Sequence, residues 1–361
     1  MKLIIAGGGT GGHLFPGIAV ARELIRQQPE SEVLFICTSK DIDQSILEKS
    51  GFRFYPLKLT SVSGGLINAL KGIGLMLKAA VSARKELSRF VPDAILGVGG
   101  GSSVPTVLLA AGKRIPIFIQ EQNLVMGKAN RRLARFSRKV FLAYGQAGKA
   151  IVPRINSLVT GNPVRPTISQ AYSSARTLGL RDGVFTIFAL GGSQGSERLN
   201  TAVREAALNL KHSKAEFQFL HQTGQAQYQE IKDFYRKEGI TAYTAAFIDE
   251  IEQAYVSADL VVSRAGATSI AELTYLGKPM VLVPYPYATD DHQMMNARML
   301  AGKGAAICLS DDETLSGALC KTLEELIQDK ARLEHMSRAS AQLGPHGAAE
   351  KIVLEMLKAV G

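Results

Sequence analysis

Short apolar runs alternate with longer amphipathic stretches along the whole chain, and this alternation constrains the fold most strongly. Runs rich in Val, Ile, Leu and Phe predict buried strands, and helical patterns such as GIAVARELIRQQ separate them. The predicted strands are KLIIAG, EVLFICT, AILGVGG, IPIFIQE and KVFLAY in the first half, and FTIFALGG, FQFLHQTG, ADLVVSRAG and PMVLVPYP in the second. Apolar strands joined by helical crossovers are typical of α/β proteins whose parallel sheets are covered on both faces.

The two halves of the chain repeat one pattern. Each opens with a strand that runs into a glycine loop and a helix, at residues 3–13 and 186–196, and the segment VTGNPVRPT interrupts the pattern between them. We therefore predict two Rossmann-like domains, residues 1–163 and 164–344, with a final helix at about 345–361 that packs back on the first domain. Ligands of open α/β sheets bind at the carboxyl ends of the strands, so we expect a shared cleft between the domains.

Composition narrows the class of partner and the compartment. The 361 residues carry a formal charge of +10, which favours an anionic partner such as a nucleic acid, a nucleotide or an anionic membrane. Cys37, Cys308 and Cys320 are widely spaced, so neither a disulfide framework nor a zinc site is indicated, and we expect a cytoplasmic protein. The sequence contains no apolar run of the roughly 18 residues that a transmembrane helix needs.

The first glycine loop argues against two common nucleotide-binding classes. Its glycines fit the spacing G-x-G-x-x-G, but the second predicted strand ends in Cys-Thr-Ser, without the acidic residue that holds the ribose of a nicotinamide cofactor. No Gly-Lys-Ser/Thr follows the glycines, which excludes a Walker loop. A glycine loop at a helix N-terminus still favours anions, and similar loops follow strands at 97–103 and 191–195. Three such loops predict two phosphorylated ligands, or a diphosphate on each side of a cleft.

His13 stands in the first turn of the helix that follows the first loop. Near the positive end of the helix dipole its pKa is expected to fall, which keeps the imidazole neutral and able to accept a proton. The position therefore predicts a general base. The alternative is a histidine that caps its own helix.

The densest group of polar residues lies at 263–297. A strand ends at Ser263, a helix begins near Thr268, and Glu272 lies about one turn into it, where it can accept hydrogen bonds from the vicinal hydroxyls of a ribose. The alternative for Glu272 is an ordinary capping box with Ser269. The later run DDHQMMN suggests a metal site only weakly, because its carboxylates are adjacent in sequence and do not share a helix face.

Seven motifs occur together in the order and spacing of one bacterial enzyme family. They are GGGTGGHLFPG, GVGGGSSVP, QEQN, TGNPVR, LGGSQGS, SRAGATSIAEL and DDHQMMNA. On these motifs, which span essentially the whole chain, the sequence resembles the MurG-type transferases. Those cell-wall enzymes move N-acetylglucosamine (GlcNAc) from UDP-GlcNAc to undecaprenyl-pyrophosphoryl-MurNAc-pentapeptide, where MurNAc is N-acetylmuramic acid.

The resemblance implies properties of the whole protein. It implies a GT-B fold, inversion at the sugar carbon, no cofactor, no metal in the active site and no nucleic-acid partner. It places the protein in peptidoglycan synthesis, peripherally bound to the cytoplasmic face of the inner membrane.

Two features depart from the family pattern. The chain has no tryptophan, although relatives often carry aromatic residues on the membrane face, and His292 stands where some relatives have glutamine.

The resemblance also implies roles for individual residues. His13 would remove the proton from the 4-hydroxyl of the acceptor as this hydroxyl attacks C1 of GlcNAc. The loop of Gly99, Gly100, Gly101 and Ser102 would hold the diphosphate of the acceptor. The donor UDP-GlcNAc would be bound by Thr10, Gly11, Gly12, Asn123, Arg165, Ser193, the backbone near Ile248, Ala267, Thr268, Ser269, Glu272 and Gln293.

A candidate membrane-binding helix lies at 64–90, and a second basic stretch lies at 131–139. On the helix, apolar residues and lysines recur at helical spacing and form neighbouring stripes. The apolar stripe comprises Leu66, Leu70, Ile73, Leu77 and Val81, and the basic one Lys71, Lys78 and Lys85, with Arg84 and Arg89 nearby. Because an undecaprenyl acceptor stays in the bilayer, we expect these stripes to contact an anionic membrane. The alternative is a helix whose apolar stripe faces the core.

Three other functions stay open from the residues alone. The chain is alternatively another GT-B glycosyltransferase, a UDP-GlcNAc 2-epimerase of the same architecture, or a binder of nucleotide sugars without catalysis. The loop at 97–103 favours a pyrophosphoryl acceptor, which argues against another GT-B glycosyltransferase. In a binder without catalysis, His13 would have no function.

Overall fold

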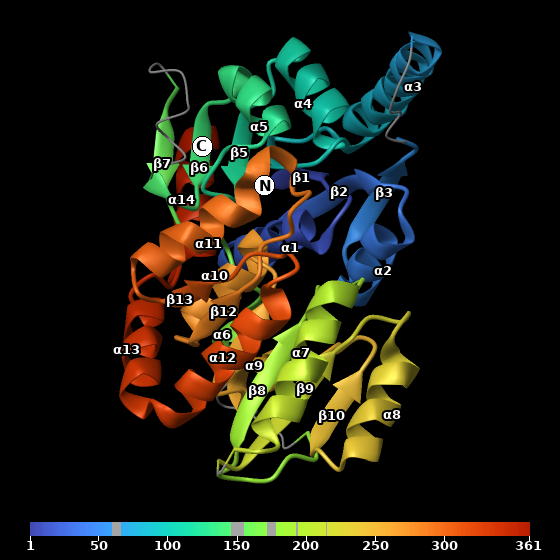
Figure 1. Cartoon of the computed structure of the whole chain (residues 1–361). Helices are drawn as coiled ribbons and strands as arrows, with labels where there is room; N and C mark the ends of the chain where they lie inside the picture. The colour runs from blue at the N-terminus through green and yellow to red at the C-terminus, as the bar shows by residue number, and fades with distance from the viewer. Residues whose placement is uncertain (60–65, 146–154, 172–177, 193, 214) are drawn as a thin grey trace. The chain divides into compact units, whose positions relative to one another are not determined.

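The computed structural model describes residues 1–59, 66–145, 155–171, 178–192, 194–213 and 215–361, with the backbone alone described at 66–73. The chain divides into two compact units (Figure 1). Unit 1 comprises residues 1–165 and 345–361, and unit 2 comprises residues 166–344.

Unit 1 is built on a seven-stranded parallel sheet with the order β3-β2-β1-β4-β5-β6-β7. The first six strands follow the Rossmann order 3-2-1-4-5-6. The strands are β1 (Lys2–Gly7), β2 (Glu32–Thr38), β3 (Arg53–Leu57), β4 (Ala94–Gly99), β5 (Ile117–Glu121), β6 (Lys139–Leu142) and β7 (Ser157–Val159). The carboxyl ends of β1, β4 and β5 therefore lie next to one another.

Helices cover both faces of this sheet because side chains alternate across each strand. Leu3 and Ile5 pack on the side of α1 and α2, and Ile4 and Ala6 pack on the side of α3, α4 and α5, which Figure 1 shows grouped together. The helices are α1 (Gly11–Gln27), α2 (Asp41–Ser50), α3 (Leu66–Phe90), α4 (Ser103–Gly112), α5 (Lys128–Leu133) and the short 3-10 helix η1 (Ala134–Phe136).

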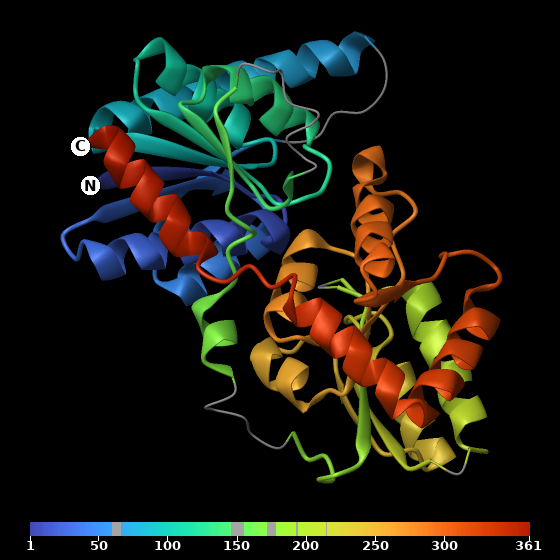
Figure 2. The same cartoon turned by 90° about the vertical axis from the view of Figure 1, so that its left-hand side faces the viewer.

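The helix α14 (Ala348–Val360) returns to unit 1 and packs beside α1, as Figure 2 shows. Its side chains Ile352, Val353 and Met356 are buried in the same core as Leu14 of α1. The chain also approaches itself closely just before α14. Gly161, which follows β7, has a φ of +86°, and a β-carbon there would lie 2.7 Å from Pro345. The segment before α14 is therefore packed tightly against the residues that follow β7.

Unit 2 repeats the architecture with a six-stranded parallel sheet of order β10-β9-β8-β11-β12-β13. Its strands are β8 (Phe185–Leu190), β9 (Phe217–Gln222), β10 (Ala242–Ala245), β11 (Leu260–Ser263), β12 (Met280–Leu282) and β13 (Ala306–Cys308). Its helices are α6 (Pro166–Ser169), α7 (Glu197–Leu210), α8 (Tyr228–Glu238), α9 (Ile251–Ser257), α10 (Ala267–Tyr275), the 3-10 helix η4 (Thr289–Asp291), α11 (His292–Gly302), α12 (Leu315–Gln328) and α13 (Lys330–Ala341).

The predicted fold class, two Rossmann-like α/β domains, is confirmed, and all nine predicted runs contain strands. The strands without a predicted run are β3, β7, β10 and β13, which are the four sheet edges. None of the helices in the described part of the chain is long and apolar enough to cross a membrane.

Candidate active site

The start of α1 forms the centre of the candidate site in unit 1. Thr10 is the N-cap residue with an extended backbone (φ −155°, ψ 155°), and Gly11, Gly12 and His13 form the first turn. The His13 amide donates to the Thr10 carbonyl at 3.2 Å. The N-terminus of this 17-residue helix carries the partial positive charge that attracts an anion.

A buried carboxylate, Asp43 of α2, holds the glycine loop before this helix. It accepts hydrogen bonds from the Gly9 amide at 2.7 Å, the Thr38 amide at 3.1 Å and the Thr38 hydroxyl at 2.6 Å. A β-carbon on Gly8, whose φ is +150°, would lie 2.3 Å from the carboxylate. Asp43 therefore occupies the Gly9 amide.

The imidazole of His13 lies against Gly99, the last residue of β4. A β-carbon at Gly99 would be 3.0 Å from both Nδ1 and Cε1 of the ring, and the φ of Gly99 is +97°. Burial lowers the pKa of His13, against the opposing charges of Glu121 and Asp43. The lowering of the pKa agrees with the prediction, but its main cause is burial and not the helix dipole that the sequence analysis named. The capping alternative is wrong, because Thr10 holds the N-cap position.

The loop predicted to bind the acceptor diphosphate touches the first glycine loop backbone to backbone. The Gly8 amide donates to the Gly99 carbonyl at 3.3 Å, and a β-carbon on Gly100 would lie 2.2 Å from the Gly8 carbonyl oxygen. Gly101 is exposed, whereas Ser102 is buried, and its hydroxyl has no hydrogen-bond partner among the described residues. The structure thus brings the first residue of this loop, Gly99, next to His13.

Asn123 is held by Glu121, a carboxylate that the sequence reasoning missed. Glu121 is 1% exposed, and its Oε1 accepts from the Asn123 amide at 3.0 Å and from Nδ2 of Asn123 at 3.1 Å. Its Oε2 accepts from the Gly127 amide at 3.0 Å and from Nδ2 of Asn130 at 2.9 Å. The motif QEQN contains Glu121 and marks this segment in the sequence. Only the hydrogen bonds between Glu121 and Asn123 identify Glu121 as the residue that orders Asn123.

Arg165 also lies near the start of α1. Its guanidinium stacks over the ring of Phe15 at 4.4 Å from the ring centroid. Ser193, which like Arg165 is predicted to bind the donor, lies outside the described residues.

In unit 2, the helix α10 starts at the carboxyl end of β11. Gly266 is its N-cap, so Ala267, Thr268 and Ser269 form the first turn. Glu272 follows in the second turn and is 1% exposed. The capping-box alternative for Glu272 is wrong, because the N-cap residue is a glycine and the cap has no side-chain hydrogen bond.

Two further predicted donor-binding residues of unit 2, Ile248 and Gln293, lie on other segments and have partners of their own. The Ile248 amide donates to Oε1 of Gln222 at 2.9 Å, so its amide is already paired. Gln293 accepts from the Tyr285 amide at 2.9 Å, which anchors its Oε1. Nδ1 of His292 lies 2.6 Å from the Thr289 carbonyl oxygen. Within the described residues, no three His, Cys, Asp or Glu side chains form a group that could hold a metal ion.

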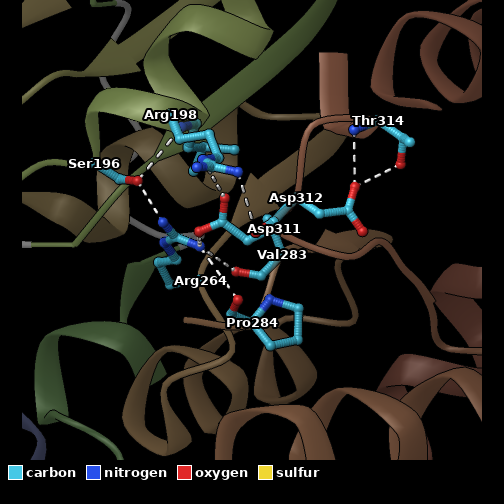
Figure 3. Close-up of polar contacts among 9 residues, drawn as sticks. Ser196, Arg198, Arg264, Val283, Pro284, Asp311, Asp312 and Thr314 are labelled. Carbon is cyan, nitrogen blue, oxygen red and sulfur yellow. Dashed lines mark hydrogen bonds and ion pairs between the residues drawn. The ribbon is translucent and has the colours of Figure 1, made fainter. Parts of the chain in front are cut away.

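Arg264, from the motif SRAG, ties together loops that follow three strands of unit 2 (Figure 3). Its NH1 lies 2.8 Å from Oδ2 of the nearly buried Asp311 and donates to the Val283 carbonyl at 3.1 Å. Its NH2 donates at 2.5 Å to Oγ of Ser196, the N-cap of α7. Arg198 lies on the other oxygen of Asp311, with its Nε at 3.3 Å. The sequence reasoning assigned no role to this cluster, which orders the start of α7 and the segment after β12.

On α3, the described part of the predicted apolar stripe faces outward. Leu77 is 63% exposed and Val81 is 71% exposed, whereas Ala79 and Ala83 of the same helix are buried. The core-facing alternative is therefore wrong for the two exposed residues. The basic residues Lys78, Arg84, Lys85 and Arg89 are also exposed, and the side chains of Leu66, Leu70, Lys71 and Ile73 lie outside the described residues.

Comparison with known proteins identifies the family. The N-terminal domain of glycosyltransferase family 28 matches residues 3–142, and the C-terminal domain of the same family matches residues 186–352. The chain belongs to glycosyltransferase family 28. Within this family it is 41% identical over 358 residues to the UDP-N-acetylglucosamine–N-acetylmuramyl-(pentapeptide) pyrophosphoryl-undecaprenol N-acetylglucosamine transferase of Geobacter sulfurreducens, covering 99% of this chain and 98% of that protein. The Geobacter metallireducens protein of the same name is 40% identical with the same coverage.

Solved structures agree with this family 28 assignment. The crystal structure of MurG from Acinetobacter baumannii superimposes with a TM-score of 0.77 at 29% identity and covers 99% of both chains. A UDP-GlcNAc 2-epimerase from Neisseria meningitidis superimposes with a TM-score of 0.72, but at 17% identity this likeness concerns the fold alone. The prediction of a MurG-type glycosyltransferase is confirmed.

Proposed function

We propose that this family 28 enzyme transfers GlcNAc from UDP-GlcNAc to the 4-hydroxyl of MurNAc in undecaprenyl-pyrophosphoryl-MurNAc-pentapeptide, with inversion at C1. The names of full-length relatives at about 40% identity support the two substrates. The observation that carries the chemistry is the position of His13, in the first turn of α1 and against the 99–102 loop. A neutral imidazole at this place is suited to accept the proton of an acceptor hydroxyl.

In the proposed reaction, the bond from O4 of MurNAc to C1 of GlcNAc forms as the bond from C1 to the UDP oxygen breaks. The O4 proton passes to His13, and UDP leaves with the electron pair of the broken bond. Stabilisation of the departing diphosphate matters at least as much as the base, because negative charge develops there. Arg165, Ser193 and the first turn of α10 at Ala267, Thr268 and Ser269 supply it.

The donor and the acceptor use different parts of the chain in this proposal. Unit 2 holds most of the donor: Glu272 binds the ribose hydroxyls, the backbone near Ile248 contacts the uracil, and Gln293 binds the GlcNAc hydroxyls. Unit 1 holds the acceptor diphosphate on Gly99, Gly100, Gly101 and Ser102. It also contacts the donor through Thr10, Gly11, Gly12 and Asn123.

The same proposal places the protein peripherally on the cytoplasmic face of the bacterial inner membrane. Leu77 and Val81 of α3 are exposed, and Lys78 and Lys85 are exposed beside them, which supports contact with an anionic surface. Apolar side chains enter the headgroup region and basic ones attract anionic lipids.

Release of UDP from UDP-GlcNAc, measured with and without the lipid-linked acceptor, tests the proposed activity. We expect release that depends on the acceptor, with a β-linked GlcNAc in the product by NMR. Turnover of UDP-GlcNAc to its 2-epimer without acceptor would identify the epimerase alternative, and release with an unrelated alcohol but not with the lipid would identify another glycosyltransferase.

A further inference from the structure

Gln122, directly after β5, is a buried side chain that the proposed mechanism does not use. It is 1% exposed. Its Nε2 donates to the Val98 carbonyl at 2.7 Å and to Oε1 of Gln120 at 2.5 Å. Both N–H groups of the amide are thus directed at acceptors. A flip of the side-chain amide would place its oxygen against these two acceptor oxygens, so the orientation of the amide and the position of Oε1 are fixed.

Two buried polar atoms in this region have no hydrogen-bond partner among the described residues: Oε1 of Gln122 and Nδ1 of His13. They belong to one neighbourhood. Val98, which anchors Gln122, precedes Gly99, against which the Nδ1 edge of His13 lies. Gln122 and the Val98 backbone both oppose the lowering of the His13 pKa by burial. The carboxylates of Glu121 and Asp43 act in the same direction.

We infer that Gln122 is a positioning residue that keeps the single proton of neutral His13 on Nδ1, so that the lone pair of Nε2 faces the acceptor hydroxyl. A carbonyl oxygen can only accept, so the ring nitrogen that faces it must carry the proton. In a neutral imidazole the other nitrogen is then unprotonated and is the basic one. The tautomer belongs to the free protein, and its use as a base rests on the proposed function.

NMR of protein labelled with ¹⁵N-histidine tests the inference without any activity measurement. The His13 signals are assigned from the spectrum of His13→Ala. At a pH above the His13 pKa we expect a protonated Nδ1 and an unprotonated Nε2. Gln122→Met, which keeps the side-chain volume but loses the carbonyl, should give a mixture of tautomers, whereas Gln122→Glu, which keeps an acceptor, should retain the proton on Nδ1. Gln27→Met is the control. Gln27 lies at the other end of α1 from His13, so this variant should leave the His13 signals unchanged.

Kinetics give a second measurement. A lost neutral hydrogen bond corresponds to roughly a 2- to 10-fold change, so kcat of Gln122→Met should fall by about that factor with the donor KM unchanged. The acid limb of its pH profile should move to lower pH, and that of Gln122→Glu to higher pH. A proton on Nε2 of wild-type His13, or a tautomer that Gln122→Met leaves unchanged in a folded variant, would overturn the inference. Full turnover by His13→Ala would instead overturn the base assignment while the tautomer result stands.

Discussion

Replacing His13 by alanine removes the proposed base and leaves the rest of the first turn of α1 in place. General-base catalysis is worth about 10²–10⁴-fold, so kcat of His13→Ala should fall within that range. Because none of the proposed donor contacts uses the His13 side chain, the affinity for UDP measured by calorimetry should stay close to the parent value. His212→Ala, an exposed histidine of unit 2, is the matched control and should keep full turnover.

Two outcomes would contradict this assignment. Parental turnover by His13→Ala would exclude the base role. A large loss of UDP affinity would make His13 a phosphate ligand.

A second histidine makes the stability of unit 2 depend on pH. His221 is fully buried between the hydroxyl of Tyr235 at 3.0 Å and Oδ1 of Asn200 at 3.1 Å, and burial lowers its pKa to about 3. Its folded pKa lies below the unfolded value of about 6.5, so its contribution to stability is complete above pH 6.5 and is lost as the pH falls toward 3. Between pH 6.5 and pH 5 this loss amounts to about 2 kcal/mol.

Urea unfolding at pH 7 and pH 5 measures this effect. His221→Gln should lose less stability on acidification than the parent does, and His212→Gln should behave like the parent. If His221→Gln and the parent lose the same free energy, another group causes the acid sensitivity.

At the residue scale, the local pattern predicts some site residues and cannot predict others. The place of Thr10 and His13 follows from a strand, a glycine loop and a helix start that adjoin in sequence. Asp43, Glu121 and Gln122 reach the same neighbourhood from α2 and from the end of β5, and nothing local marks a buried carboxylate or amide as a partner of a distant loop. Such partners become visible only when the strand order is known.

At the scale of elements, burial decides what the sequence can predict. Central strands such as β1 and β4 are buried on both faces and therefore appear as continuous apolar runs. The edge strand β7 is exposed along its three residues, and β3 contains Pro56, so neither shows that pattern. The helix α3 shows the opposite case, because two of its large apolar side chains, Leu77 and Val81, face solvent, while Leu87 and Phe90 are buried.

The exposed stripes of α3 lead to a prediction about membrane binding. Each basic residue near an anionic leaflet contributes about 1 kcal/mol, and salt screens this attraction. Reversing Lys71, Lys78 and Lys85 to glutamate should therefore abolish sedimentation with anionic vesicles at low salt and leave UDP affinity intact. A triple reversal of the exposed Lys211, Lys237 and Lys321 in unit 2 is the control and should still sediment. Continued vesicle binding by the α3 variant would place the docking surface elsewhere, with residues 131–139 as the next segment to test.

At the scale of the whole molecule, α14 is part of the core of unit 1. Met356 is fully buried against the α1 side of the sheet, whereas Leu354 on the same helix is 41% exposed. Met356→Ala should lower the free energy of unfolding of unit 1 by about 2–5 kcal/mol, since it leaves a cavity. Leu354→Ala should change it by less than about 0.5 kcal/mol. Equal effects of the two substitutions, measured by denaturant unfolding, would show that α14 does not stabilise unit 1 in solution.

The return of α14 to unit 1 has a consequence for biosynthesis. The ribosome makes residues 345–361 after all of unit 2, so a nascent unit 1 waits while residues 166–344 are translated. At about 5–20 residues per second this takes on the order of ten to forty seconds. Throughout that interval the apolar side of α1 lacks Ile352, Val353 and Met356, and it offers a binding surface to chaperones. Unit 2, which is continuous in sequence, can therefore complete its folding before the unit that precedes it.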